Sequence, residues 1–215
     1  MKITVVYDNE VYRKDTDLKS DWGFSCLIET GKDIILFDTG TNGEILLDNM
    51  RALGINPKRI NKIVISHEHL DHAGGLGALL SIVDDVEIYR LGSEKPKGKS
   101  RLFVVNEGQK IADKIYTTGK LSGTIEEQSL VIEGKEGLYV IVGCSHPGVE
   151  NILEVAQRYG RVVGIIGGFH DFSDLSILKD LSLISPCHCT RFKREILEIY
   201  PNKSMECGVG RVFEI

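Results

Sequence analysis

The sequence predicts an α/β protein whose core holds two β-sheets with helices outside. Short apolar runs of strand length alternate with segments of helical periodicity along the whole chain. Both halves pass from consecutive strands into strand–helix alternation, a pattern that allows a two-sheet core. With 42% hydrophobic and 27% charged residues, the 215-residue chain has the composition of an ordinary globular protein. This length fits one large domain or two small ones.

The first third of the chain is predicted to alternate between strands and helices. Strands are expected at residues 2–7, 24–29, 33–37 and 63–66, and the turn Thr30-Gly31-Lys32 joins the second and third. Apolar residues at helical spacing predict helices over 44–53 and 76–82. Gly54 lies where a helix C-terminus favours glycine.

The middle third is predicted to be rich in strands, and the last third alternates again. Strands are expected at 86–89, 102–105, 114–118, 129–133, 138–142, 162–166, 183–184 and 209–215. Helices are expected at 149–159, 175–181 and 193–200.

Composition excludes several classes of partner. The net charge is −5 and the chain has no basic block, so we expect no nucleic-acid binding. The longest apolar stretches are only of strand length, so we expect no membrane-spanning helix and no membrane partner. Residues 1–7 form a strand pattern and lack the apolar core of a signal peptide, which predicts a cytoplasmic protein. The one basic loop, 93–101, is interpreted as a solvated surface loop or as an anion-binding flap.

The most informative motif is a cluster of histidines. His67, His69, Asp71 and His72 fall within six positions, directly after the apolar run Lys62-Ile63-Val64-Ile65. In an extended segment His67 and His69 point to the same side. Imidazole binds zinc and iron, and a carboxylate adds negative charge and a hard donor. Gly74 and Gly75, which follow, allow close backbone packing beside the ions. The run therefore predicts a metal site.

The remaining histidines also follow apolar, strand-like segments. His146 follows the run 138–142, His170 follows 162–169, and His188 follows 183–187. Strand C-terminal ends that meet at one sheet edge form the active sites of many α/β proteins. We expect His146 and His188 to be metal ligands, and His170 to be either a ligand or a structural residue.

Asp38 ends another predicted strand, in Leu36-Phe37-Asp38-Thr39-Gly40. One interpretation is that its carboxylate accepts a hydrogen bond from the far nitrogen of a ligating histidine, which would fix the tautomer and orientation of that ring. The alternative is a turn or helix-capping aspartate.

The chain resembles the metallo-β-lactamase superfamily. Its signature, His-x-His-x-Asp-His, is present as His67, His69, Asp71 and His72, and the motif order covers essentially the whole chain. The resemblance implies a four-layer αββα sandwich, one domain over residues 1–215, with two metal ions at one sheet edge. By the same resemblance, one ion takes His67, His69 and His146, and the other takes Asp71, His72 and His188.

The sequence departs from the superfamily pattern at one place. Members usually supply a bridging aspartate after a strand between the third and last motifs, often as Gly-Asp. Here the strand ends in Gly167-Gly168-Phe169-His170-Asp171. His170 replaces the carboxylate, Asp171 serves, or only water links the two ions.

Three further phrases resemble a narrower branch of the superfamily: Gly143-Cys144-Ser145-His146-Pro147-Gly148, Gly167-Gly168-Phe169-His170 and Cys187-His188-Cys189-Thr190. That branch contains metal-dependent hydrolases and the archaeal dihydropterin-(ribofuranosyl)aminobenzene-phosphate synthase. Cys187 and Cys189 are interpreted as packing around His188 rather than as ligands.

The leading hypothesis is a metal-dependent hydrolase with a dinuclear centre and metal-activated water, acting on an ester, a phosphoester or a related small molecule. Asp71 would orient the water or take its proton, and His170 would stabilise charge or protonate a leaving group. The default cofactor is two Zn²⁺ ions, and iron or manganese suits the same donors.

Two alternatives remain. In a synthase, the ions would hold a pyrophosphate leaving group, and Lys95, Lys97, Lys99 and Arg101 would contact phosphate. A non-enzymatic metal-dependent sensor is the third hypothesis, which the intact motifs disfavour. The sequence specifies neither the substrate nor the oligomeric state.

Overall fold

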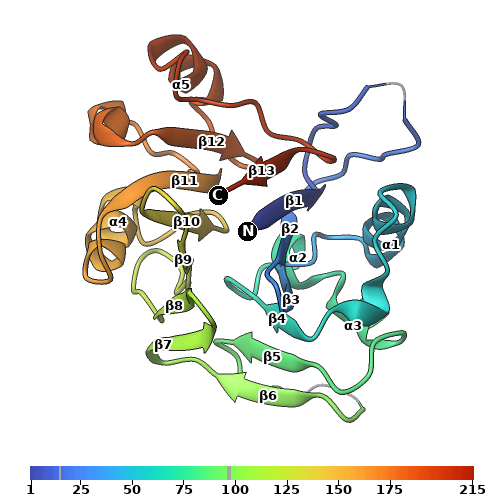
Figure 1. Ribbon diagram of the computed structural model, residues 1–215. Helices are drawn as coiled ribbons and strands as arrows, with labels where there is room; N and C mark the ends of the chain where they lie inside the picture. Colours follow the sequence, from blue (N-terminus) through green and yellow to red (C-terminus); the bar gives the residue numbers. More distant parts are fainter. Residues whose placement is uncertain (15, 96–97) are drawn as a thin grey trace. The chain divides into compact units, whose positions relative to one another are not determined.

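The computed structural model describes residues 1–14, 16–95 and 98–215. It divides into two compact units, each built around one sheet (Figure 1). The first unit comprises Met1–Val105 and Cys207–Glu214, and the second comprises Asn106–Glu206 and Ile215. The single domain over 1–215 stays a prediction.

The first unit contains a seven-stranded sheet in the order β13-β1-β2-β3-β4-β5-β6. Strands β1 to β3 pair antiparallel, as does β13 with β1, whereas β3 to β6 pair parallel. The parallel strands bring their carboxyl ends to one edge, which is where side chains gather for chemistry in such sheets. The strands are β1 (Lys2–Tyr7), β2 (Ser25–Glu29), β3 (Ile34–Phe37), β4 (Lys62–Val64), β5 (Glu87–Arg90), β6 (Arg101–Val104) and β13 (Val212–Glu214).

Two amphipathic helices of this unit bury apolar side chains against the sheet. Helix α1 (Gly43–Ala52) contributes Leu46 and Met50, and α3 (Leu76–Leu80) contributes Leu76 and Leu79, to a cluster with strand residues such as Leu36 and Ile63. Each such side chain contributes about 1.5–3 kcal/mol when it is removed from water. Asn42 caps α1 by accepting the backbone N–H groups of Glu44 and Ile45. The short helices are η1 (Pro57–Arg59) and α2 (Leu70–Ala73).

The second unit contains a six-stranded sheet in the order β12-β11-β10-β9-β8-β7. Strands β7 to β10 pair antiparallel, and β10 to β12 pair parallel. Three carboxyl ends therefore again meet at one edge. The strands are β7 (Glu107–Ala112), β8 (Ile115–Gly119), β9 (Leu130–Glu133), β10 (Leu138–Val142), β11 (Val162–Gly168) and β12 (Leu183–Cys187).

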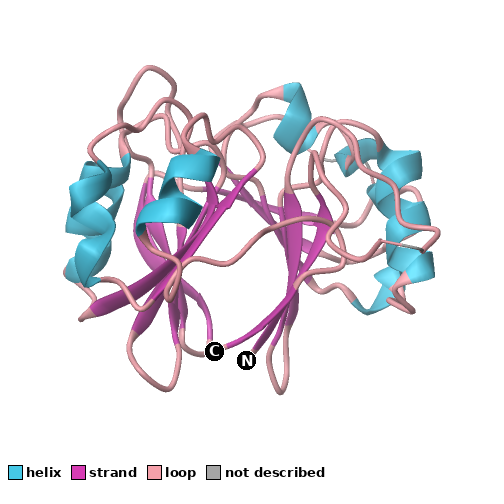
Figure 2. Cartoon of the chain, turned by 90° about the horizontal axis from the view of Figure 1, so that it is seen from above, coloured by secondary structure: helices cyan, strands magenta, loops and turns pink. Residues whose placement is uncertain are grey.

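The helices of the second unit also supply one side of a core. Helix α4 (Val149–Gln157) buries Val149, Ile152 and Ala156 on one face, and α5 (Lys193–Ile199) buries Ile196, in a cluster with β10, β11 and β12. The 3₁₀ helix η2 (Leu175–Asp180) adds Leu178. In Figure 2 the helices of each unit lie along a face of that unit's own sheet.

The predicted fold class, a mixed α/β protein with two sheets, is confirmed. Two local predictions differ. The helix predicted at 175–181 is a 3₁₀ helix, and strand β7 was not predicted, because its residues from Glu107 to Lys110 are exposed and polar at the end of the sheet order. Within the described ranges, no helix has the length and apolar character needed to cross a bilayer.

Asn49 of α1 is predicted to hold the segment between β1 and β2 in place. Its fully buried side chain donates to the carbonyls of Val6 (3.0 Å) and Lys19 (2.9 Å) and accepts the N–H of Lys19 (2.8 Å). Asn49→Ala should lower the free energy of unfolding by roughly 2–4 kcal/mol, because these partners lose their hydrogen bonds. Urea denaturation measures this change. Asn56→Ala, which removes one exposed hydrogen bond to Lys58, is the control and should cost less than about 1 kcal/mol.

Candidate metal centre

The histidine run of the first unit lies at the carboxyl end of β4. His67 follows the strand, His69 is the N-cap of α2, and Asp71 and His72 belong to that helix. His67 and His72 are fully buried, with ring centroids 4.2 Å apart, and the rings of His67 and His69 are 4.6 Å apart. The strand-to-helix turn therefore brings all four predicted ligands of the run together.

Asp38, at the end of the neighbouring strand β3, is the hub of this cluster. Its side chain is fully buried. Oδ1 accepts the Ser66 N–H at 2.7 Å, and Oδ2 accepts the Ser66 hydroxyl at 2.8 Å. Oδ2 also contacts Nδ1 of His72 at 2.7 Å. One carboxylate thus connects β3, the end of β4 and helix α2.

These contacts determine the tautomers of two histidines. A carboxylate only accepts hydrogen bonds, so His72 donates from Nδ1–H and keeps the lone pair on Nε2. The Ser66 hydroxyl gives its single proton to Asp38 and so accepts from Nδ1–H of His67, 2.9 Å away. In the neutral form of each ring, Nε2 then carries the lone pair that metal binding requires.

The donor atoms fit a divalent cation. Nε2 of His67 lies 3.1 Å from Nδ1 of His69, and Nε2 of His72 lies 3.5 Å from Oδ2 of Asp71. Two nitrogens bound to one tetrahedral zinc at about 2.0–2.1 Å lie roughly 3.3–3.4 Å apart. The two pairs have the spacing and the mixed nitrogen and oxygen chemistry of ligands to transition metals.

The glycines after the run allow the close packing that the sequence predicts. A Cβ atom on Gly74 would lie 2.3 Å from the Thr41 carbonyl oxygen, and one on Gly75 would lie 2.3 Å from that of Thr39. Thr39 in turn donates its N–H and its hydroxyl to the His72 carbonyl, at 2.7 and 2.9 Å. The chain after β3 therefore packs directly on the backbone of α2.

Glu68 lies between two predicted ligands but makes different contacts. It forms a bidentate ion pair with Arg90 and accepts the Gly92 N–H at 2.9 Å. Burial raises the pKa of the Glu68 carboxyl, but the hydrogen bonds from Arg90 and Gly92 outweigh it and hold that pKa below its usual value. Glu68 is therefore ionised, and its contacts with Arg90 and Gly92 hold the histidine run in place. The same residues line a pocket of about 410 Å³ with Leu70, Ala73, Gly74 and Glu94.

In the second unit, His146 is positioned by a buried carboxylate. Glu127 is fully buried and accepts four successive backbone N–H groups after β10. Its Oε1 accepts from Gly143 (3.0 Å), Cys144 (3.0 Å) and Ser145 (3.1 Å), and its Oε2 accepts from His146 (2.9 Å). Four charge-assisted hydrogen bonds fix the turn that carries the histidine.

His170 and His188 follow β11 and β12 at the same edge of the second sheet. Both have positive φ angles, 43° and 45°, as does Ser145 at 63°. Such conformations are uncommon for residues other than glycine and gather at functional sites. His188 is buried, whereas the His170 side chain is 47% exposed, with Nδ1 3.1 Å from Oδ2 of Asp171.

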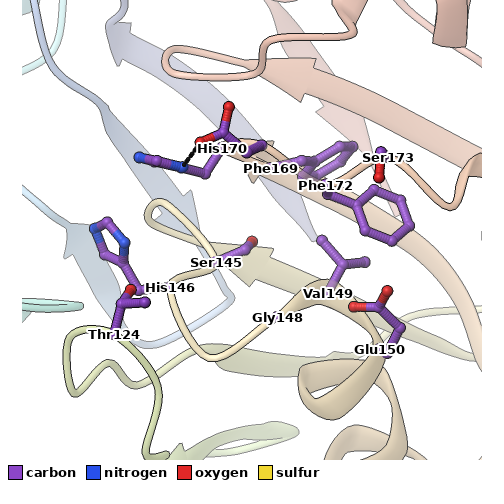
Figure 3. Close-up of a pocket in the computed structure, with 11 residues that line it drawn as sticks. Thr124, Ser145, His146, Gly148, Val149, Glu150, Phe169, His170, Phe172 and Ser173 are labelled. Atoms are coloured by element: carbon purple, nitrogen blue, oxygen red, sulfur yellow. Dashed lines mark ion pairs between the residues drawn. The ribbon is translucent and has the colours of Figure 1, made fainter.

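A pocket of about 380 Å³ lies beside His146 and His170 (Figure 3). The two rings are 5.1 Å apart. Val149, Phe169 and Phe172 supply apolar surface, and Glu150 supplies a carboxylate. The other lining residues are Thr124, Ser145, Gly148, Asp171 and Ser173. The pocket therefore suits a small, partly apolar group that tolerates a nearby negative charge.

The structure groups the predicted site residues within each unit. His67, His69, Asp71 and His72 gather around Asp38 in the first, and His146, His170 and His188 gather at one sheet edge in the second. The hydrogen bond predicted from a histidine to Asp38 is present. The roles of the predicted histidines and of Asp71 as metal ligands stay predictions. Sequence reasoning missed Ser66, two residues after the end of β4, and Glu127, for which the sequence gives no signal.

The basic loop of 93–101 contributes little that the structure describes. Arg101 pairs with Glu87 at 2.8 Å, and Lys97 lies outside the described residues. An anion-binding flap therefore stays a prediction.

Comparison with known proteins defines the family. Residues 23–157 match the model of the metallo-β-lactamase superfamily. Because this match covers more than half of the chain, the protein belongs to that superfamily.

Individual relatives include both a synthase and a hydrolase. The chain is 29% identical to the 7,8-dihydropterin-6-methyl-4-(β-D-ribofuranosyl)-aminobenzene-5′-phosphate synthase of Methanocaldococcus jannaschii, over 82% of this chain and 83% of the relative. It is 27% identical to the uncharacterized protein MJ0448 of the same organism, over 99% and 100%. The crystal structure of Tm1679, a metal-dependent hydrolase of the β-lactamase superfamily, matches with a TM-score of 0.80 and 28% identity, over 100% and 99%.

Replacing Asp38 should change a histidine tautomer. In Asp38→Asn, an amide nitrogen facing His72 would donate to Nδ1 and move the ring proton to Nε2, which removes the metal-binding lone pair. ¹⁵N NMR of the metal-free protein measures this change directly. The free energy of unfolding should also fall by roughly 2–4 kcal/mol, because a buried network is broken.

The exposed pair of Asp113 with Lys110 provides the control, and Asp113→Asn should leave both the tautomer and the stability unchanged. A His72 ring that keeps its proton on Nδ1 in Asp38→Asn would contradict the assignment.

Proposed function

We propose that this protein is a metal-dependent hydrolase with a dinuclear centre, acting on an ester, a phosphoester or a related small molecule. The observation that carries the proposal is the Asp38 network, which holds a ring proton on Nδ1 of both His67 and His72, so that Nε2 of each neutral ring can bind a metal beside the further donors His69 and Asp71. Such prior organisation of ligands is typical of metal sites. Similarity to Tm1679 supports the same class of activity.

The proposed ligand sets are those that the resemblance to the superfamily implies. One ion would be held by His67, His69 and His146, and the other by Asp71, His72 and His188. Zn²⁺ suits these nitrogen-rich donors best, and iron or manganese fits the same set. When bound, the cations polarise a scissile carbonyl or phosphoryl group and lower the pKa of water.

Two residues of the chain would move protons. The Asp71 carboxylate, 15% exposed, would orient the attacking water and accept its proton. His170 would give a proton to the leaving group from Nε2, with Asp171 Oδ2 3.1 Å from its Nδ1 orienting the ring. The half-exposed position of His170 beside the pocket of Figure 3 allows it to reach a substrate.

The pocket next to His146 is the proposed site for the leaving group. Among the described residues, neither lysine nor arginine lines it, and Glu150 and Asp171 add negative charge, so its occupant would be small and not itself a phosphate. A phosphorylated substrate would place its phosphoryl group at the cations. We further propose a cytoplasmic location without nucleic-acid or membrane partners, and the net charge of −5 supports the absence of nucleic-acid binding.

Exchanging single histidines should separate metal binding from proton transfer. His67→Ala should lose bound metal and hydrolysis together, because a ligand is removed. His170→Asn should keep the metal and lower kcat by about 100-fold, because only a proton donor is lost. Elemental analysis of protein purified without added metal, followed by a screen of phosphodiesters, lactones and thioesters, provides both measurements.

Full activity of a chelated, metal-free protein would refute the hydrolase proposal. Loss of metal in His170→Asn would instead make His170 a ligand and contradict its role as proton donor.

The second candidate function is that of a synthase. It is favoured by the 29% identity to the aminobenzene-phosphate synthase over four fifths of both chains. In this reaction a pterin diphosphate would be attacked by an aminobenzene ribosyl phosphate, and pyrophosphate would leave. Incubation with both substrates should then release pyrophosphate at a rate that depends on both concentrations. No release, together with hydrolysis of simple esters, would reject the synthase.

A further inference from the structure

Two cysteine side chains meet beside the end of β11 in the second unit. Cys144 lies on the turn after β10, and Cys189 lies on the turn after β12. The S–H group of Cys189 points to the sulfur of Cys144, with an Sγ–Sγ distance of 3.2 Å. The two residues are 45 positions apart in the chain, so only the fold of this unit brings their sulfur atoms together.

The space for this pair comes from a residue without a side chain. Gly168 is the last residue of β11, and a Cβ atom there would lie 2.6 Å from Sγ of Cys189. The same Cβ atom would lie 2.5 Å from the Gly143 carbonyl oxygen and 3.4 Å from Cα of Cys144. Even a methyl group at position 168 would therefore displace the sulfur of Cys189, and glycine keeps the pair in contact.

Hydrogen bonds fix both turns and so hold the two sulfur atoms at this distance. The backbone N–H of Cys144 donates to the buried carboxylate of Glu127 at 3.0 Å. On the other turn, the Thr190 hydroxyl donates to the Cys187 carbonyl at 2.7 Å and accepts the Phe169 N–H at 3.0 Å. Groups held in a fixed geometry react with each other as if they were present at very high concentration.

The two cysteines differ in their access to solvent. Cys144 is only 3% exposed, whereas Cys189 is partly exposed. An oxidant from solution can therefore reach Cys189, and Cys144 contacts that sulfur from the interior. Because an S–S bond is about 2.05 Å long, the sulfur atoms must come only roughly 1 Å closer to form one.

We propose that Cys144 and Cys189 form a reversible disulfide by exchange with a low-molecular-weight disulfide, which makes this sheet edge a redox-sensitive modification site. In the first step the Cys189 sulfur bonds to one sulfur of the oxidant, whose S–S bond breaks, and the other half leaves as a thiol. In the second step the Cys144 sulfur bonds to that of Cys189, and the remaining half leaves as a thiol. The two cysteines are oxidised, the oxidant is reduced, and the departing thiols carry both protons.

This modification depends neither on the proposed hydrolase function nor on a bound metal. His146 and His188 each lie within two residues of one of the cysteines. The disulfide would therefore tie together the two turns that carry these histidines. Disulfides in cytosolic proteins are usually transient and redox-sensing, which agrees with the location proposed above.

Oxidised glutathione tests the pair in the full-length, unmutated protein. After incubation with an excess of it and blocking of the remaining thiols, a non-reduced tryptic digest should contain peptide 136–158 linked to peptide 180–191. The first peptide has Cys144 as its only cysteine, and fragmentation of the second distinguishes Cys189 from Cys187. Treatment with dithiothreitol should remove the link.

Two serine variants separate the two steps. Cys144→Ser should retain one glutathionyl group on Cys189, because the thiol that would displace it is missing. Cys189→Ser should keep Cys144 reduced, because the oxidant does not reach the buried sulfur. The matched control is Cys26→Ser, which removes another buried cysteine and should form the link to the same extent as the wild-type protein.

The outcomes distinguish this proposal from the proposed function. A wild-type protein whose Cys144 stays reduced, with or without a glutathionyl group on Cys189, would overturn the disulfide. A link from Cys144 to Cys187 would overturn it as well. Formation of the Cys144–Cys189 link in a protein that neither binds metal nor hydrolyses any ester would refute the hydrolase and leave the disulfide standing.

Discussion

Burial of the Asp38 carboxylate is the constraint on which the first half of the site depends. A buried charge costs several kcal/mol unless hydrogen bonds compensate it. Ser66 and His72 compensate the charge of Asp38 from their observed positions, 2.7–2.8 Å away. The hydrogen bonds that compensate this buried charge therefore also align β3, β4 and α2. They direct Nε2 of His67 and of His72 away from the carboxylate. The same hydrogen-bond network therefore stabilises the fold and orients the histidines for metal binding.

The second unit also contains a buried carboxylate whose charge must be compensated by hydrogen bonds. Glu127 is as deeply buried as Asp38, and it accepts four successive backbone N–H groups. It therefore fixes the backbone of the turn that carries Cys144 and His146. The positive φ angles of Asp38, Ser145, His170 and His188 cost about 1–3 kcal/mol each. Tight hydrogen bonding at the strand ends, such as that from the Ser145 hydroxyl to the Gly168 carbonyl at 2.7 Å, offsets part of this strain.

The sequence predicts the parts of the site that depend on local order. His67 to His72 are adjacent in the chain, and strand-end placement was sufficient to connect Asp38 with a histidine 34 residues away. Glu127 could not be found in this way, because the polar run Glu126-Glu127-Gln128 is typical of a solvated loop, and only tertiary packing buries it. Strand β7 was missed because it lies at the end of the sheet order. Its exposed polar residues do not show the apolar alternation by which strands are predicted.

The missing aspartate shows how packing limits the chemistry available at a site. At Gly168 the obstruction includes a backbone carbonyl as well as a sulfur, so a side chain there would require the whole turn after β10 to move. Glu127 opposes that movement with four hydrogen bonds. Any negative charge supplied to the centre by the second unit must therefore come from a side chain already on the fixed turns. Asp171, which follows β11, is 63% exposed and lies 3.4 Å from Arg191.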